Sequence, residues 1–212
     1  MIVQDPLSKY PRLGRYALFF SIIPGYFHEY AAEEVIEKSL NRQSVHGFLK
    51  LLQDKNVAIA FPSYYKGKYA IKPEVILDYA QVYTPSFIKE AKRTLGSAFK
   101  RGDQVQNFYI DFLLQLSSFK LSGKADLNGV LDSCKENAFH PSSWFTDAVK
   151  GLILVMACRK EWRPLFKVLS EENKVLAWNL FMDAAADRSE DYSLEGSEEL
   201  FLSLSGTRFE RT

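Results

Sequence analysis

Residues 32–61 read AEEVIEKSLNRQSVHGFLKLLQDKNVAIAF, and this stretch decides the fold. Within it, residues 44–55 carry apolar side chains at the spacing i, i+3, i+4, i+7, which makes one face of a helix; they are Val45, Phe48, Leu49 and Leu52. Residues 32–40 predict a preceding helix, because apolar positions share one face and two glutamates in its first turn suit the helix dipole. Asn41 stands between the two helices, where a tight turn needs a residue that tolerates positive φ.

A short β-hairpin is predicted directly after the second helix. Residues 57–61 are a wholly apolar run rich in strand-forming residues, and residues 69–71 form a second short run before Pro73. The loop of about seven residues between the two runs contains Gly67, which favours an antiparallel pair. The predicted order is therefore helix, turn, helix and hairpin.

This order and its apolar spacing resemble the winged helix-turn-helix domain of bacterial transcription regulators, over residues 32–75 only. In that family the second helix enters the major groove and the hairpin wing lies along the DNA backbone. The resemblance implies contacts to double-stranded DNA from the front of the second helix and from the wing. On the helix side the matching residues are Arg42, Gln43, Ser44, His46, Gly47 and Lys50. In the wing they are Tyr64, Tyr65, Lys66 and Lys68.

The charges of this region leave two uses of the winged helix open. Arg42 and Gln43 suit the edges of bases, and the lysines suit phosphates. Residues 33–75, however, carry seven Lys or Arg against five Asp or Glu, and three of the acidic residues belong to the first helix: Glu33, Glu34 and Glu37. Because DNA binding depends on the neutralisation of phosphates, a winged helix that contacts protein is the alternative.

A second basic surface is predicted on the next long helix. Thr84 and Pro85 start that helix with an N-cap oxygen and a proline at its first position. Its residues Lys89, Lys92 and Arg93 point away from its apolar side, so they are candidates for contacts to a nucleic-acid backbone. The alternative is an ordinary solvated helix face.

The remaining segments predict a mainly α protein. Residues 1–15 suggest an irregular lead-in, and residues 16–30 an aromatic-rich helix interrupted near Pro24. Helices are then predicted over 74–83, 104–121, 125–138, 142–158, 162–169, 171–187 and 197–205. We expect a winged-helix domain with its lead-in over residues 1–83. An all-α bundle, or a short array of helical hairpins, is expected over residues 84–212.

Charge differs between the two halves of the chain. Residues 1–101 hold fifteen Lys or Arg and nine Asp or Glu, a net charge of +6, whereas residues 102–212 hold twelve and seventeen, a net charge of −5. This split indicates a nucleic-acid surface in the first half. The helical second half would then contact a protein subunit or a second copy of the chain. The alternative is that the two halves are folded units that differ in net charge without having different partners.

No catalytic, metal or cofactor pattern stands out. Ser-x-x-Lys begins at Ser63, Ser97 and Ser117, but the companion motifs of penicillin-binding enzymes are absent from the sequence. The three histidines have no second metal ligand at helical spacing, and no glycine-rich phosphate loop exists. We therefore expect neither enzymatic activity nor a bound cofactor.

The sequence also favours a cytoplasmic protein with no membrane contact. Its most apolar run, residues 151–158, is far shorter than the roughly 20 residues that cross a bilayer. Two cysteines are too few for a disulfide framework. The leading hypothesis is a non-enzymatic nucleic-acid-associated or regulatory protein. The alternative is an interaction scaffold, or an accessory region of a larger machine such as a helicase.

Overall fold

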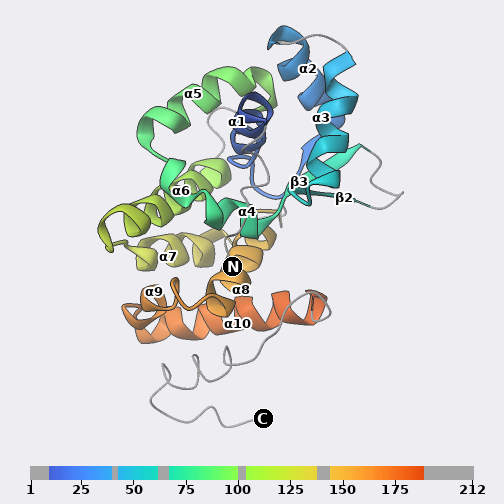
Figure 1. The fold of residues 1–212 in the computed structure, drawn as a ribbon. Coiled ribbons are helices and arrows are strands. Elements are labelled where there is room, and N and C mark those ends of the chain that lie inside the picture. The colour runs from blue at the N-terminus through green and yellow to red at the C-terminus, as the bar shows by residue number, and fades with distance from the viewer. Residues whose placement is uncertain (1–9, 40–42, 62–66, 100–103, 138–143, 189–212) are drawn as a thin grey trace. The chain divides into compact units, whose positions relative to one another are not determined.

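The computed structural model describes residues 10–39, 43–61, 67–99, 104–137 and 144–188. Helices dominate this part of the chain, with a small antiparallel sheet (Figure 1), so the expected mainly α fold is confirmed at this level. The chain divides into two compact units, Met1–Ser117 and Ser118–Thr212, and each is described by itself. The division differs from the boundary expected at residue 83, because the helix after that residue packs against the first helices of the chain.

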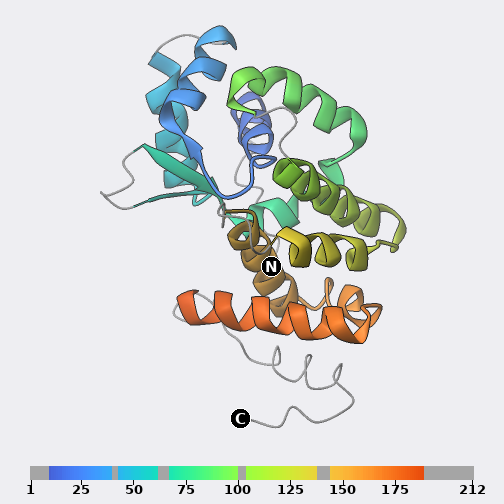
Figure 2. The same cartoon turned by 180° about the vertical axis from the view of Figure 1, so that it is seen from behind.

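The first unit opens with three helices and three strands. In chain order they are α1 (Pro11–Phe20), β1 (Phe27–His28), α2 (Glu29–Ser39), α3 (Gln43–Asp54), β2 (Ala58–Ala60) and β3 (Lys68–Ile71). The expectation for the N-terminal segment was wrong in two respects. Residues 11–15 are helical because Pro11 starts α1 at a position where proline is favoured. The expected helix over residues 16–30 ends at Phe20, and the chain passes through β1 into α2 (Figure 2).

The sheet has the strand order β1-β3-β2, with both pairs antiparallel. The expected hairpin of two strands is present, and β1 adds a third strand that the sequence did not predict. Asn56 adopts a positive φ of 58° two residues after the end of α3, and this left-handed residue redirects the chain into β2. The backbone nitrogen of Val57 then donates to the carbonyl of Leu52, which closes the end of the helix.

One face of the sheet builds the core of the first unit. Phe27 stacks on Phe20 with ring centroids 4.4 Å apart, and Phe20 in turn lies 6.1 Å from Phe48 of α3. A buried polar pair lies in the same unit: Ser21 Oγ donates to the Leu18 carbonyl and lies 2.8 Å from the Tyr83 hydroxyl. Because Ser21 donates its hydroxyl proton to the Leu18 carbonyl, the Tyr83 hydroxyl is the donor in the hydrogen bond between the two side chains. Burial raises the pKa of Tyr83 far above its usual value, which keeps that donor protonated.

The rest of the first unit is helical. It consists of α4 (Pro73–Asp78), η2 (Ala80–Val82), α5 (Pro85–Leu95), η3 (Gly96–Ala98) and the greater part of α6 (Gln104–Ser122). The predicted start of α5 is confirmed, since Thr84 Oγ1 accepts from the Phe87 backbone nitrogen. Phe87 lies 5.3 Å from Phe19 of α1, so the aromatic side of α5 packs on the first helix.

The second unit is helical throughout its described residues. After the end of α6 come α7 (Leu127–Asn137), α8 (Trp144–Cys158), α9 (Pro164–Lys167) and α10 (Glu171–Arg188). Helix α10 packs against α8 and α7, and Trp162 is fully buried. The helix expected over residues 162–169 is shorter than predicted, and the one expected over residues 197–205 lies outside the described residues.

The packing of α7 on α10 is organised by one buried asparagine. The side-chain nitrogen of Asn173 donates to the Asn128 side-chain oxygen at 3.1 Å and to Asp132 at 3.1 Å. The hydrogen bonds from Asn173, and then from Lys135, lower the pKa of Asp132. Over the part of the chain that is described, no helix is both long enough and apolar enough to cross a membrane.

Candidate nucleic-acid interface

The outward side of α3 is the first candidate surface. The apolar side of this helix is sealed in the core by Phe48, Leu49 and Leu52, as its spacing predicts. Gly47, Lys50 and Gln53 lie on the opposite, exposed side. A Cβ on Gly47 would meet no atom within 4 Å, so close packing does not require glycine at this position. The helix backbone is therefore exposed there. Figure 1 shows α2 and α3 side by side above β2 and β3.

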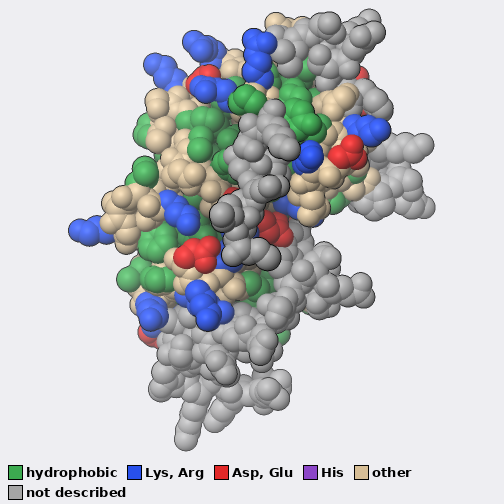
Figure 3. Space-filling model, in the orientation of Figure 1, with side chains coloured by type: hydrophobic (Ala, Val, Ile, Leu, Met, Phe, Trp, Pro, Cys, Tyr) green, Lys and Arg blue, Asp and Glu red, His purple; other side chains and the backbone are tan. Residues whose placement is uncertain are grey.

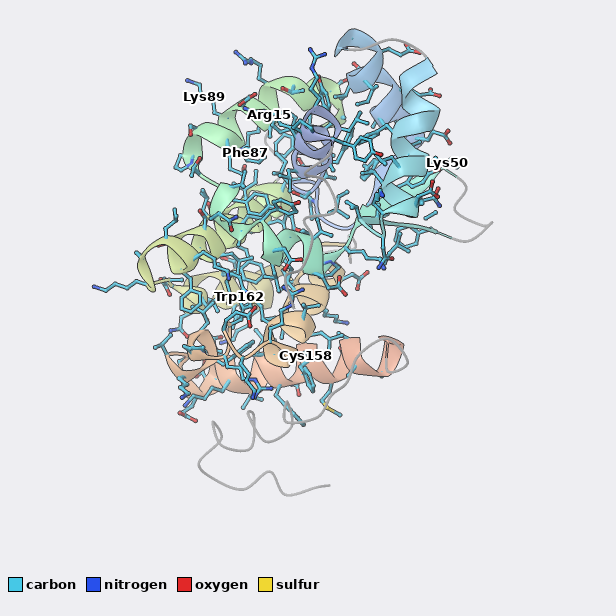
Figure 4. All side chains as sticks on the ribbon, viewed as in Figure 1. Arg15, Lys50, Phe87, Lys89, Cys158 and Trp162 are labelled. Atoms are coloured by element: carbon cyan, nitrogen blue, oxygen red, sulfur yellow. The ribbon has the colours of Figure 1, made fainter. Side chains whose placement is uncertain are left out.

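Lys50 is the α3 candidate whose side chain the structure describes. It is exposed, and Figure 4 shows it at the outer edge of the first unit. Gln43, Ser44 and His46 belong to α3, but their side chains lie outside the description, and so does Arg42. No acidic residue precedes Asp54 in the sequence of this helix. The α3 surface therefore combines polar, basic and glycine positions with one carboxylate, the exposed Asp54 at the end of the helix.

The hairpin that was expected to act as a wing is described at its base. Lys68 begins β3 and is half-buried, with its Nζ 4.1 Å from the ring centroid of Tyr26. This distance is typical of a cation–π contact, which fixes the ammonium group against the sheet. Tyr64 and Lys66, predicted at the tip of the wing, lie outside the described residues. Gly67 has a φ of 75° and would place a Cβ 3.4 Å from Glu29, so glycine suits the return of the hairpin.

The second candidate surface lies on α5. Lys89 and Arg93 are exposed, while Lys92 is half-buried with its Nζ 5.2 Å from the ring centroid of Phe99. Arg15 of α1 joins this surface but is paired with Glu90, through Nε at 3.2 Å and Nη2 at 2.5 Å. Figure 3 shows the basic side chains gathered over α5. The predicted basic side of this helix is thus exposed and partly committed to internal contacts.

The two candidate surfaces are separate. In Figure 4, Lys50 and Lys89 lie at opposite edges of the first unit, with Arg15 between them and nearer to Lys89. The described residues therefore do not join them into a continuous basic face.

One of the glutamates of α2, Glu34, has its negative charge compensated by neighbouring groups. It should therefore repel phosphate less than the sequence alone suggests. Glu34 accepts from Lys38 Nζ at 2.7 Å and from the Ser97 hydroxyl of η3 at 2.6 Å. These two hydrogen bonds, Lys38 first, lower the pKa of Glu34. Its charge is thus compensated on the side of α2 that meets η3, whereas Glu33 and Glu37 remain exposed.

A third surface was missed at the sequence level. Successive residues of a strand point to opposite sides, so the register of the sheet places one set of side chains opposite the core. We call this set the outer face; it consists of Tyr26, His28, Ile59, Phe61, Lys68 and Ala70. Its members include exposed apolar side chains, namely Ile59 and Phe61. The signal available in the sequence was the alternation of Tyr26, His28 and Tyr30, which resembles half of a strand pattern.

The described residues of the motifs considered in the sequence make other contacts in the structure. Among the described residues, no group of three or more His, Cys, Asp or Glu could hold a metal ion. The hydroxyl of Ser117 donates to the Gln81 carbonyl, and Lys120 Nζ lies 4.9 Å from the ring centroid of Trp162. Burial raises the pKa of the Cys158 thiol, which disfavours the reactive thiolate.

Comparison with protein-family models, curated proteins and solved structures finds no match to this chain. The candidate surfaces therefore rest on the chain's own residues and geometry.

Proposed function

We propose that the first unit is a winged helix that binds double-stranded DNA, with α3 as the helix that enters the groove. The order α1-β1-α2-α3-β2-β3, with the sheet order β1-β3-β2, supports this proposal. The observation that carries it is the two-sided character of α3. One side seals the core through Phe48 and Leu52, and the other exposes Gly47, Lys50 and Gln53. A groove-reading helix needs this division.

In this proposal α5 supplies a second contact to phosphates. Lys89 and Arg93 are exposed on it, and the nearest acidic partner, Glu90, is paired with Arg15. The protein acts by binding and not by catalysis. The helical second unit would contact a protein subunit or a second copy. The exposed apolar side chains Val175 and Met182 on α10 favour such a contact.

The test is a titration of a fluorescein-labelled DNA duplex with the full chain over a series of salt concentrations. Lys50→Ala should weaken binding at low salt and reduce the slope of log K against log salt by about one, because one phosphate contact is lost. Lys160→Ala is the matched control, since Lys160 is an exposed lysine of the second unit. The proposal fails if the chain binds no duplex at low salt, or if the two variants behave alike.

A second function, protein contact through the same winged helix, is favoured by one observation. The candidate cations form two separate groups, and Lys68 and Lys92 are already engaged with aromatic rings. Phosphate binding usually draws on a continuous basic surface. A pull-down after nuclease treatment tests this alternative. A protein captured by the wild-type chain and lost with Gly47→Arg, in a chain that binds no duplex, would support it.

A further inference from the structure

The outer face of the sheet combines exposed rings with cations. Phe61 and Ile59 of the β2 region are each 37% exposed, and Tyr30, the second residue of α2, is 65% exposed. The register places His28 opposite Lys68, while the Phe61 backbone nitrogen donates to the Lys68 carbonyl. His28, Lys68 and Phe61 therefore form one row across the sheet, on the side opposite Phe27 and Tyr69. Ile59 lies on the same side beside Ala70, and Tyr30 adjoins the row from the start of α2.

The rings of this surface are held in defined orientations. Tyr30 stacks on His28, with ring centroids 4.9 Å apart and an angle of 18° between the ring planes. His28 packs edge-on against Tyr26 at 5.4 Å, and Tyr26 packs edge-on against Phe61 at 6.1 Å. Tyr30 is thus the exposed end of a stack, and its ring is oriented before any ligand arrives.

The charges around the rings are positive along the central strand. Lys68, Ala70 and Lys72 alternate on the same side of β3 and its continuation, since the Lys72 backbone nitrogen still pairs with the Val57 carbonyl. Lys72 Nζ is held by the Asn56 side-chain oxygen at 2.5 Å. None of the six residues of the outer face is acidic. One carboxylate, that of Glu29, lies beside Gly67 at the hairpin return.

We propose that the outer face binds an unpaired nucleic-acid strand, with bases stacked on Tyr30 and Phe61 and phosphates near Lys68 and Lys72. Aromatic rings beside cations are the pattern that binds single strands without sequence preference, because every base offers a flat π face. A docked protein would instead need a contiguous apolar patch, and here lysines and a histidine separate the apolar side chains. This site goes beyond the duplex contact proposed for α3, since it uses other residues and another form of nucleic acid.

The experiment titrates labelled oligothymidine and a labelled duplex, separately, with the full chain and its variants. Tyr30→Ala and Phe61→Ala should each weaken oligothymidine binding by roughly 5- to 100-fold, the usual range for the loss of one stacked base. Both should leave duplex binding within about twofold, because α3 is untouched. Tyr30→Phe keeps the ring and should bind oligothymidine as the wild type does. Lys50→Ala should show the opposite selectivity and affect the duplex only.

Each outcome separates the two proposals. If the wild-type chain does not bind oligothymidine, or if Tyr30→Ala and Phe61→Ala bind it like the wild type, the outer-face proposal is overturned whatever the duplex result. If oligothymidine binding depends on these rings while no duplex binds, the outer-face proposal holds and the proposed function fails. If the two variants lose a purified protein partner but bind oligothymidine unchanged, the surface is a protein-docking site and the proposal is wrong.

Discussion

The two faces of the small sheet contrast most sharply within the first unit. They arise from the same strands, and each carries a phenylalanine and an isoleucine, yet one face is buried and the other is partly exposed. Phe27 and Ile71 on the inner face are 3% and 8% exposed. Phe61 and Ile59 on the outer face are each 37% exposed. A phenylalanine and an isoleucine therefore occur on both faces in different environments.

Apolar side chains of the same sheet therefore have different roles on its two faces. The inner residues gain from full burial against α1 and α3, as the Phe27–Phe20 stack shows. The outer residues remain partly hydrated and are held by contacts among themselves, such as Tyr26 with Phe61. We therefore expect the inner face to determine stability and the outer face to determine binding.

The largest effect is expected for the matched phenylalanines. Phe27→Ala should lower the free energy of unfolding by about 3–5 kcal/mol, because it removes a buried ring and leaves a cavity. Phe61→Ala should cost about 1–2 kcal/mol, since more than a third of this residue is already hydrated and less area is lost from burial. Urea denaturation followed by circular dichroism measures both. Equal losses would mean that the outer face is part of the core.

The matched isoleucines should repeat this contrast on a smaller scale. Ile71→Ala should cost about 2–4 kcal/mol, and Ile59→Ala less than about 1 kcal/mol, for the same reason of burial. Thermal melts of the two variants, run side by side, provide the comparison. A larger loss for Ile59→Ala than for Ile71→Ala would reverse the assignment of the faces.

Gly47 offers a smaller test at the exposed side of α3. Gly47→Ala should raise the free energy of unfolding by roughly 0.5–1 kcal/mol, because alanine favours the helix and the new methyl group meets no atom. An increase in the denaturation midpoint would support an unpacked, outward position for this residue. A decrease would show that the position is packed and cannot face a partner.

The smallest effect concerns the pH dependence of stability at Glu34. Its pKa is lowered in the folded chain by hydrogen bonds from Lys38 and Ser97, so ionised Glu34 favours the folded state. This contribution is present above the usual carboxyl pKa and is lost as the pH falls through the lowered value. Ser97→Ala should flatten the acid side of the stability profile slightly. An unchanged profile in urea titrations at several pH values would contradict this role.

Much of the helical framework could be predicted from the sequence. The apolar spacing of α3 and the Thr84 cap of α5 are local signals, and both appear as expected. The strand β1 could not be predicted, because two residues carry no periodicity and the strand is defined by its pairing with β3. The start of α1 could not be predicted with certainty from the sequence, because Pro11 is compatible both with an irregular segment and with a first helical position.

The outer face could not be predicted for a related reason. Residues 57–61 are apolar at every position, so their pattern does not reveal which side of the strand faces the core. That choice is made by the register with β3, which sets Ile59 opposite Ala70 and leaves both outside. Lys50, in contrast, could be placed on the exposed side because it falls between the apolar positions of a regular helix.

The most direct test of the central claim, that the first unit binds DNA through α3, is amide hydrogen exchange of the full chain with and without a DNA duplex. If this claim holds, exchange slows in α3 and α5 when the duplex is present, and exchange in α10 is unchanged. Slower exchange confined to α10, or no change anywhere at a duplex concentration that saturates binding, would contradict it.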